Sequence, residues 1–258
     1  MHGSPELKPH RKSRVVPRQE HGNNRSVIAF RGVFWTAISM WMPSAVNLLV
    51  FLVTSRILAP EDFGVVALAA SVTFFAIAFG PFGFGEAIVQ RAELRTDHLD
   101  SVFWLCTGYA VAMAAVMYAV GGLVADWFDA GALAVLVPVF SLKVAFEMIN
   151  VVPHALIVRS MRFHLVALRT LFGTLISAAI AISLVLSGYG LWALVFAQLA
   201  DSFVKMTTTF WTSGWRPAGG PSLRPLRELA HYGLFASGNQ FVQFLGARAD
   251  QLLVGLFL

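Results

Sequence analysis

The chain has 258 residues, 57% of them hydrophobic and 13% charged, with a net charge of +5 and a mean hydropathy of +0.69. Ordinary soluble domains carry about 25% charged residues, so this composition excludes that class and is typical of a polytopic membrane protein. A lone cysteine, Cys106, excludes a disulfide framework or a cysteine metal site within one chain. The basic residues lie in the N-terminal segment and short loops, without a recognition helix, so we expect no nucleic-acid partner.

Residues 1–31 carry seven basic side chains among Pro, Ser, Asn and Gly and have too few apolar residues to build a core. This composition predicts a disordered cytoplasmic tail. The apolar run from Val33 to Leu58 follows, and it is about twice as long as the core of a secretory signal. We therefore expect an uncleaved first membrane helix.

Further apolar runs predict five more complete spans and a seventh that begins near Leu229. The five are Phe63 to Phe84, Val102 to Val124, Ala132 to Val158, Leu165 to Leu186 and Leu191 to Thr212. The second should break or bend around Gly80, Pro81, Gly83 and Gly85. The sequence thus predicts an all-α polytopic transmembrane bundle with a tail at 1–31, a six-helix lobe at 32–215, and a cytoplasmic linker with the start of a second lobe at 216–258.

The distribution of Lys and Arg predicts how these spans are oriented. With the tail inside, the cytoplasmic segments hold its seven basic residues and eight more, while the outer loops hold only Arg56. The eight are Arg91, Arg95, Arg159, Arg162, Arg169, Arg216, Arg224 and Arg227. We expect a multi-pass membrane protein with a cytoplasmic N-terminus. Because the final residues QLLVGLFL are still apolar, we also expect the chain to be a truncated form of a longer transporter.

Lys143 and Glu147 lie near the middle of the apolar stretch Leu133 to Arg159. An ionisable group at mid-membrane costs about 2.5 to 3.5 kcal/mol on insertion scales, so such groups usually face a protein interior or a wet cavity. Two interpretations are open. Lys143 attracts an anionic substrate group while Glu147 titrates or releases it, or the two form a local ion pair, because residues four apart share one helix face.

Other intramembrane polar residues extend the candidate site. Asp201 and Lys205 repeat the four-residue spacing on the sixth span, which suggests a polar interior shared with Lys143 and Glu147 if the two helices face one cavity. Arg248 and Asp250 on the seventh span either bind phosphate or brace a neighbouring helix. Asn47 is a further candidate cavity residue. The histidines, His154 among them, are too dispersed to predict a metal site.

Three segments carry a family resemblance, and they are SRILAPEDFGVVALAA from Ser55 to Ala70, FGFGEAIVQR from Phe82 to Arg91, and the stretch from Leu226 to Phe257. They resemble the polysaccharide-exporting members of the multidrug, oligosaccharidyl-lipid and polysaccharide exporter superfamily. The resemblance implies a flippase of the bacterial inner membrane that moves a polyprenyl-pyrophosphate-linked oligosaccharide across this membrane by alternating access, for O-antigen, capsule or exopolysaccharide assembly. It also implies one lobe of a two-lobe fold, membrane lipids as surroundings and other polysaccharide assembly proteins as partners.

Alternative functions stay open at this point. They are an ion-coupled drug or cation antiporter of the same superfamily, a membrane glycan polymerase or ligase, and an inactive fragment. A polymerase needs a substantial outer loop, whereas the loops here are short. No nucleotide-binding GxxxxGK[ST], GxSxG or HExxH sequence is present, which disfavours ATP-driven transport. With the short loops, the resemblance implies a membrane transporter rather than an enzyme. We expect no cofactor and leave proton or sodium coupling open.

Overall fold

The structure is a computed structural model in which residues 41–230, 233 and 235–238 are described. This part of the chain is helical and contains no strand, which confirms the predicted all-α class. Its helices are Trp41–Thr54, α2 (Pro60–Ala78), α3 (Gly83–Gln90), α4 (Thr96–Trp127), α5 (Leu133–Arg159), α6 (Phe163–Leu186), α7 (Trp192–Ser213) and one at residues 223–230. The predicted tail at 1–31 lies outside the described residues.

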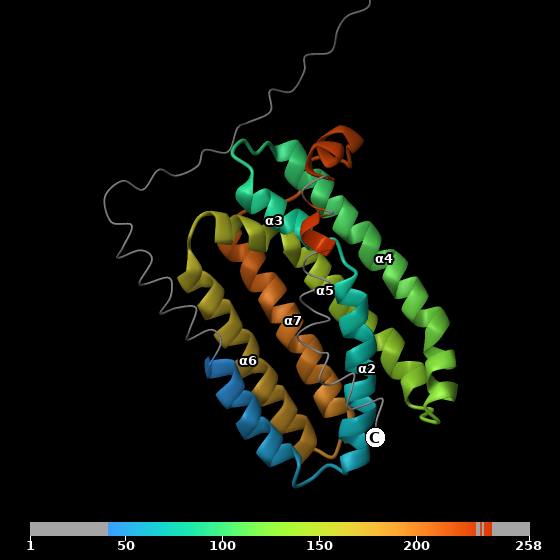
Figure 1. The fold of residues 1–258 in the computed structure, drawn as a ribbon. Coiled ribbons are helices and arrows are strands. Elements are labelled where there is room, and N and C mark those ends of the chain that lie inside the picture. The colour runs from blue at the N-terminus through green and yellow to red at the C-terminus, as the bar shows by residue number, and fades with distance from the viewer. Residues whose placement is uncertain (1–40, 231–232, 234, 239–258) are drawn as a thin grey trace, which may run out of the picture.

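Four of these helices, α2, α4, α5 and α6, are long and apolar enough to cross a membrane. The chain is therefore a multi-pass membrane protein. The 22-residue helix α7 runs alongside α5 and α6 (Figure 1), but its polar residues, Asp201 and Lys205 among them, make it less apolar than those four. The predicted first span is described from Trp41 onward, and there Trp41–Thr54 form a shorter apolar helix that ends in a turn.

Helix α5 is the centre of the bundle. It contacts α2, α3, α4, α6 and α7. In its most apolar stretch of 18 residues, 44% of the residues are buried, against 22% in the corresponding stretches of α2, α4 and α6. Its bounds, Leu133 and Arg159, coincide with the apolar stretch that the sequence singles out. Because neighbours surround α5, polar side chains along it can meet partners from several helices instead of facing lipid.

The predicted break after the second apolar run is confirmed. α2 ends at Ala78, and a separate short helix, α3, begins at Gly83. A Cβ atom on Gly80 would lie 2.8 Å from the backbone carbonyl oxygen of Ile77, which cannot move aside, so this turn requires glycine. Pro81 follows directly and cannot continue the hydrogen-bond ladder of α2. The chain thereby redirects α3 across the end of the bundle.

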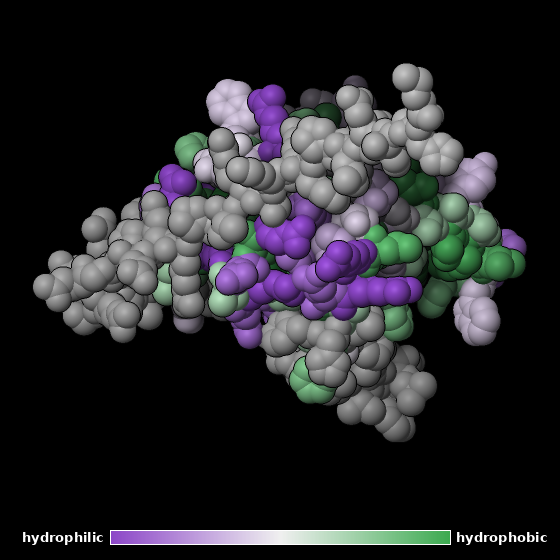
Figure 2. All heavy atoms as spheres, turned by 90° about the horizontal axis from the view of Figure 1, so that it is seen from above, coloured by the Kyte–Doolittle hydropathy of each residue, from purple (hydrophilic) through white to green (hydrophobic). Residues whose placement is uncertain are grey.

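One end of the bundle gathers α3, the beginning of α4, the end of α5 and the beginning of α6 (Figure 1). Figure 2 looks onto this end and shows hydrophilic side chains collected over its middle. Arg91, Arg95, Arg159 and Arg162 belong to the segments that meet here, whereas Arg56 belongs to the turn before α2 at the opposite end. The two ends of the described bundle thus differ in charge as the sequence predicts.

Candidate functional site

A polar stripe runs along α5 toward this basic end. It consists of Lys143, Glu147, Asn150 and His154, spaced by four, three and four residues. This spacing keeps all four side chains on one face of the helix. α6 and α7 both contact α5, so the stripe meets side chains from two other helices.

Lys143 and Glu147 each form a hydrogen bond with α7. The Nζ of Lys143 donates to the Oε1 of Gln198 at 2.8 Å, and the Oγ of Ser202 donates to the Oε1 of Glu147 at 3.0 Å. The predicted local ion pair between Lys143 and Glu147 is therefore wrong for this structure. Because α7 packs against α5, neutral partners come within reach of both charges, and Glu147 acts on Lys143 only as a nearby charge.

Asp201 and Lys205 form an ion pair within α7, with 2.6 Å between the Oδ2 of Asp201 and the Nζ of Lys205. Both side chains are 23% exposed. The two charges also act electrostatically on Lys143, so α5 and α7 bring the four predicted charged residues into one neighbourhood. Gly173 of α6 lies against this pair, since an added Cβ would be 2.8 Å from the Oδ1 of Asp201 and 3.0 Å from the Cγ of Lys205.

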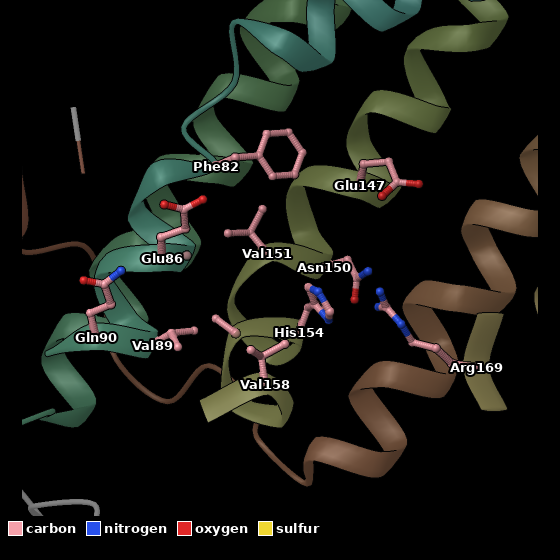
Figure 3. Close-up of a pocket in the computed structure, with 12 residues that line it drawn as sticks. Phe82, Glu86, Val89, Gln90, Glu147, Asn150, Val151, His154, Val158 and Arg169 are labelled. Carbon is pink, nitrogen blue, oxygen red and sulfur yellow. The ribbon is translucent and has the colours of Figure 1, made fainter. Parts of the chain in front are cut away.

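Arg169 of α6 adds a third cation to this neighbourhood. Its Nη1 donates to the Oγ1 of Thr209 on α7 at 2.9 Å, and Glu147 and Asp201 act on it electrostatically. The sequence predicts Arg169 in a cytoplasmic segment, and the structure places it within α6, six residues after Phe163. Figure 3 shows its guanidinium directed toward Asn150 and His154 of α5.

A cavity of about 480 Å³ lies between α3, α5 and α6, on the side of the bundle where the basic segments meet. Polar and apolar side chains both line it (Figure 3). The lining residues are Phe82, Gly85, Glu86, Val89, Gln90, Glu147, Asn150, Val151, His154, Ala155, Val158 and Arg169. The volume is within the range of about 300 to 1,000 Å³ that is usual for small-molecule sites. The polar stripe of α5 thus continues from the charged neighbourhood into a cavity.

Several buried polar atoms around the cavity have no hydrogen-bond partner within the described residues. They are the Oδ1 of Asn150, the Nδ1 of His154, the Nε of Arg169 and the Oδ1 of Asp201. An unsatisfied buried polar atom costs about 1 to 3 kcal/mol. Such atoms usually mark a place that water or a ligand completes.

The remaining predicted site residues do not join this neighbourhood in the described part of the chain. Arg248 and Asp250 lie outside the described residues. Asn47 is exposed on the helix Trp41–Thr54 and does not line the cavity. Its role stays a prediction.

The sequence analysis did not predict Asn150, His154 and Arg169 as site residues, although the sequence carried a signal for the two residues on α5. Polar residues recur along α5 at 143, 147, 150 and 154 and along α7 at 198, 201, 202, 205 and 209, which is the repeat of one helix face. Pairs four apart were recognised, but the longer stripes were not followed. Arg169 carried no such signal, because its partner Thr209 is 40 residues away.

A second polar cluster holds the chain after α7 against α3 and α4. We call it the linker clasp, and it consists of Arg91, His98, Asp100, Ser101 and Trp104. The side chains of Asp100, Ser101 and Trp104 bond the backbone of residues 218, 222 and 219, respectively. The linker is thereby fixed over the first turns of α4.

Glu228 is the anionic partner of this clasp. Its Oε2 lies 2.8 Å from an Nη2 of Arg91 and 3.1 Å from the Nε2 of His98. Because the Nδ1 of His98 accepts the backbone N–H of Arg95, the Nε2 carries the proton and donates to Glu228 even when the ring is neutral. The hydrogen bond from His98 and the neighbouring charge of Arg91 lower the pKa of Glu228.

Comparisons with known proteins agree on one family. A family model described as polysaccharide biosynthesis protein matches residues 53–258. The chain is 27% identical to the succinoglycan biosynthesis transport protein ExoT of Rhizobium meliloti over 230 residues. The matched region covers 88% of this chain and 46% of that protein. It is 23% identical over 229 residues to the teichuronic acid biosynthesis protein TuaB of Bacillus subtilis, covering 88% and 47%.

The lipopolysaccharide biosynthesis protein WzxC of Escherichia coli is also similar, with 23% identity over 246 residues, 88% of this chain and 46% of that protein. The chain therefore spans about half the length of the curated relatives it matches. No solved structure matches the chain significantly.

Proposed function

Because the chain belongs to the polysaccharide biosynthesis protein family, we propose that it moves a polyprenyl-pyrophosphate-linked oligosaccharide across the bacterial inner membrane for polysaccharide export. Membrane spans without a recognised nucleotide-binding sequence favour a transporter over an enzyme. The relatives named for succinoglycan transport and lipopolysaccharide biosynthesis support the export role.

The observation that carries the proposal is the way in which the interior cations are held. Lys143 bonds a neutral amide and Arg169 bonds a neutral hydroxyl, so neither is locked to a carboxylate. A diphosphate that reaches Lys143 would replace its bond to a neutral amide with a bond in which donor and acceptor are both charged, and the opposite charges attract each other strongly in the bundle interior. Lys143 can therefore serve as a substrate-binding cation without first leaving Glu147.

Lys205 is proposed to join Lys143 in holding the diphosphate, with Asp201 and Glu147 as the groups that release it. The ion pair within α7 holds Lys205 in the empty state. When a diphosphate competes for Lys205, Asp201 loses its partner, and the side chains of α7 that lie against Gly173 of α6 must rearrange. Such a ligand-dependent exchange of partners biases a two-state equilibrium, which is what alternating access requires.

The proposed orientation places the basic end of the bundle in the cytoplasm. Arg91 and Arg95 in the connection from α3 to α4, and Arg159 at the end of α5, lie at that end, in accordance with the positive-inside rule. The cavity between α3, α5 and α6 would then be entered from the cytoplasmic side, where lipid-linked saccharides are assembled.

The test is restoration of polysaccharide export in a strain of the source bacterium from which the gene has been deleted. The unmodified chain should restore export, and Lys143→Ala and Lys205→Ala should each abolish it at normal membrane abundance. Arg56→Ala is the matched control, because Arg56 is an exposed cation at the opposite end. Normal export by both Lys variants, or no export with the unmodified chain, would contradict the proposal.

A further inference from the structure

The cavity between α3, α5 and α6 differs in charge from the neighbourhood of Lys143. Among the described lining residues, Glu86 and Glu147 contribute two carboxylates, and Arg169 contributes the one guanidinium. Lys143 and Lys205 do not line it. A diphosphate placed in this cavity would face the carboxylate of Glu147, whose hydrogen bond comes from the neutral Ser202, and like-charge contacts are repulsive in a low-dielectric interior. The cavity is therefore poorly suited to the diphosphate itself.

The polar atoms of the lining suit a group that both donates and accepts hydrogen bonds. Asn150 is only 6% exposed, and its Oδ1 lacks a partner among the described residues, as do the Nδ1 of His154 and the Nε of Arg169. Figure 3 shows the three side chains converging from α5 and α6. A saccharide hydroxyl is donor and acceptor at once, so a polyhydroxyl group can satisfy this mixture where a purely anionic group cannot.

The rest of the lining is apolar. Phe82 and Val89 come from the α3 side, while Val151 and Val158 come from α5 (Figure 3). Ligand sites commonly combine such apolar walls with a few convergent polar groups, since the apolar faces of a ligand need contact as well. The C–H faces of a pyranose ring provide apolar surface of this kind.

We propose that this cavity receives the saccharide end of the translocated lipid, and that it selects an uncharged saccharide over an acidic one. The inference rests on the proposed function, in which Lys143 and Lys205 hold the diphosphate. Along α5, Asn150 and His154 lie seven and eleven residues beyond Lys143, or about 10 and 16 Å at 1.5 Å per residue. When the diphosphate is bound at Lys143, a sugar on its cytoplasmic side would therefore lie beside Asn150 and His154.

The test is a binding measurement with the full 258-residue chain in lipid nanodiscs. The first probe is undecaprenyl pyrophosphate without a sugar, and the second is the lipid-linked oligosaccharide extracted from cells in which its export is blocked. Asn150→Leu and His154→Gln should each weaken binding of the second probe by about tenfold or more, and leave binding of the first within about twofold. Lys143→Ala should weaken both.

Thr73→Val is the matched control, because Thr73 is buried at 1% exposure and bonds only the backbone of its own helix, α2. Equal weakening of both probes by the Asn150 and His154 variants, or no weakening of either, would overturn the saccharide site while leaving the proposed function intact. Failure of the unmodified chain to bind either probe would overturn the proposed function instead. An acidic lipid-linked saccharide that binds as tightly as an uncharged one would overturn the selectivity.

Discussion

The two polar clusters of this protein treat their charges in opposite ways. In the linker clasp, Glu228 lies against two donors, Arg91 and His98. Close by, Arg159 donates to the carbonyl oxygens of residues 88, 89, 91 and 92 at the end of α3. In the bundle interior, Lys143 and Arg169 each bond a neutral partner. Four buried polar atoms of this region, on Asn150, His154, Arg169 and Asp201, have no hydrogen-bond partner among the described residues.

The difference separates structural charges from charges available to a ligand. A guanidinium that donates to several carbonyl oxygens holds the backbone in place and has few donors left. A cation bonded to one amide or hydroxyl keeps donors that a stronger acceptor can claim. We therefore assign the clasp to holding the linker and the interior stripe to binding, and the variants below test that division.

The largest effect is expected when the interior ion pair is broken on one side. Asp201→Ala leaves Lys205 without its carboxylate inside the bundle, and loss of one member of a buried pair costs about 3 to 5 kcal/mol, less here because both side chains are partly exposed. The double change Asp201→Asn with Lys205→Met should restore stability but not export. Thermal unfolding in detergent, read by size-exclusion chromatography, checks the stability of each variant.

Arg159→Lys should have the next largest effect, on α3 rather than on the whole bundle. A lysine cannot reproduce the forked set of bonds to the end of α3, and hydrogen bonds to charged groups contribute about 1.5 to 3 kcal/mol. Hydrogen exchange of the amides at 83–92 should accelerate. The control is Arg162→Lys, at an exposed position three residues on. Unchanged exchange protection of the α3 amides in Arg159→Lys would show that the position of α3 does not depend on this residue.

Gly173→Ala should lower the unfolding temperature, whereas Gly108→Ala should raise it. An added methyl group at 173 meets Asp201 and Lys205, and such overpacking costs about 1 to 3 kcal/mol, partly offset by the higher helix propensity of Ala. At Gly108 of α4 the same methyl group meets nothing within 4 Å. Unfolding temperatures of the two variants, measured side by side, check this; equal shifts would mean that α6 and α7 are not closely apposed.

The smallest effect is expected from Glu228, because the cluster is partly exposed and solvent screens it. Since the clasp lowers the pKa of Glu228, its carboxylate stabilises the docked linker above the ordinary carboxyl pKa of about 4.3, and this contribution is lost as the pH falls through the lowered value. Exchange protection of amides 218–229, corrected for intrinsic rates, should fall with pH in the unmodified chain. Glu228→Gln should remove that pH dependence; if the variant keeps it, another group is responsible.

Local features of the fold were predictable, whereas most contacts of the site were not. The bounds of α5 follow from a long apolar stretch, and the break before α3 follows from Gly80 and Pro81. The partner of Lys143 did not follow, because a four-residue spacing points to Glu147, while Gln198 is 55 residues away and becomes a neighbour only when α7 packs on α5. Sequence periodicity gives the face of a helix but not the helix that covers it.

Thiol labelling of Asn150→Cys in inverted membrane vesicles tests whether the interior stripe faces the translocated lipid. The background is low, since the single native cysteine, Cys106, is fully buried. A charged, membrane-impermeant thiol reagent should label position 150 from the cytoplasmic side, and the extracted lipid-linked oligosaccharide should slow that labelling by about tenfold at saturation. Labelling that is absent, or that proceeds at the same rate with and without this lipid, would contradict the assignment of the stripe to substrate binding.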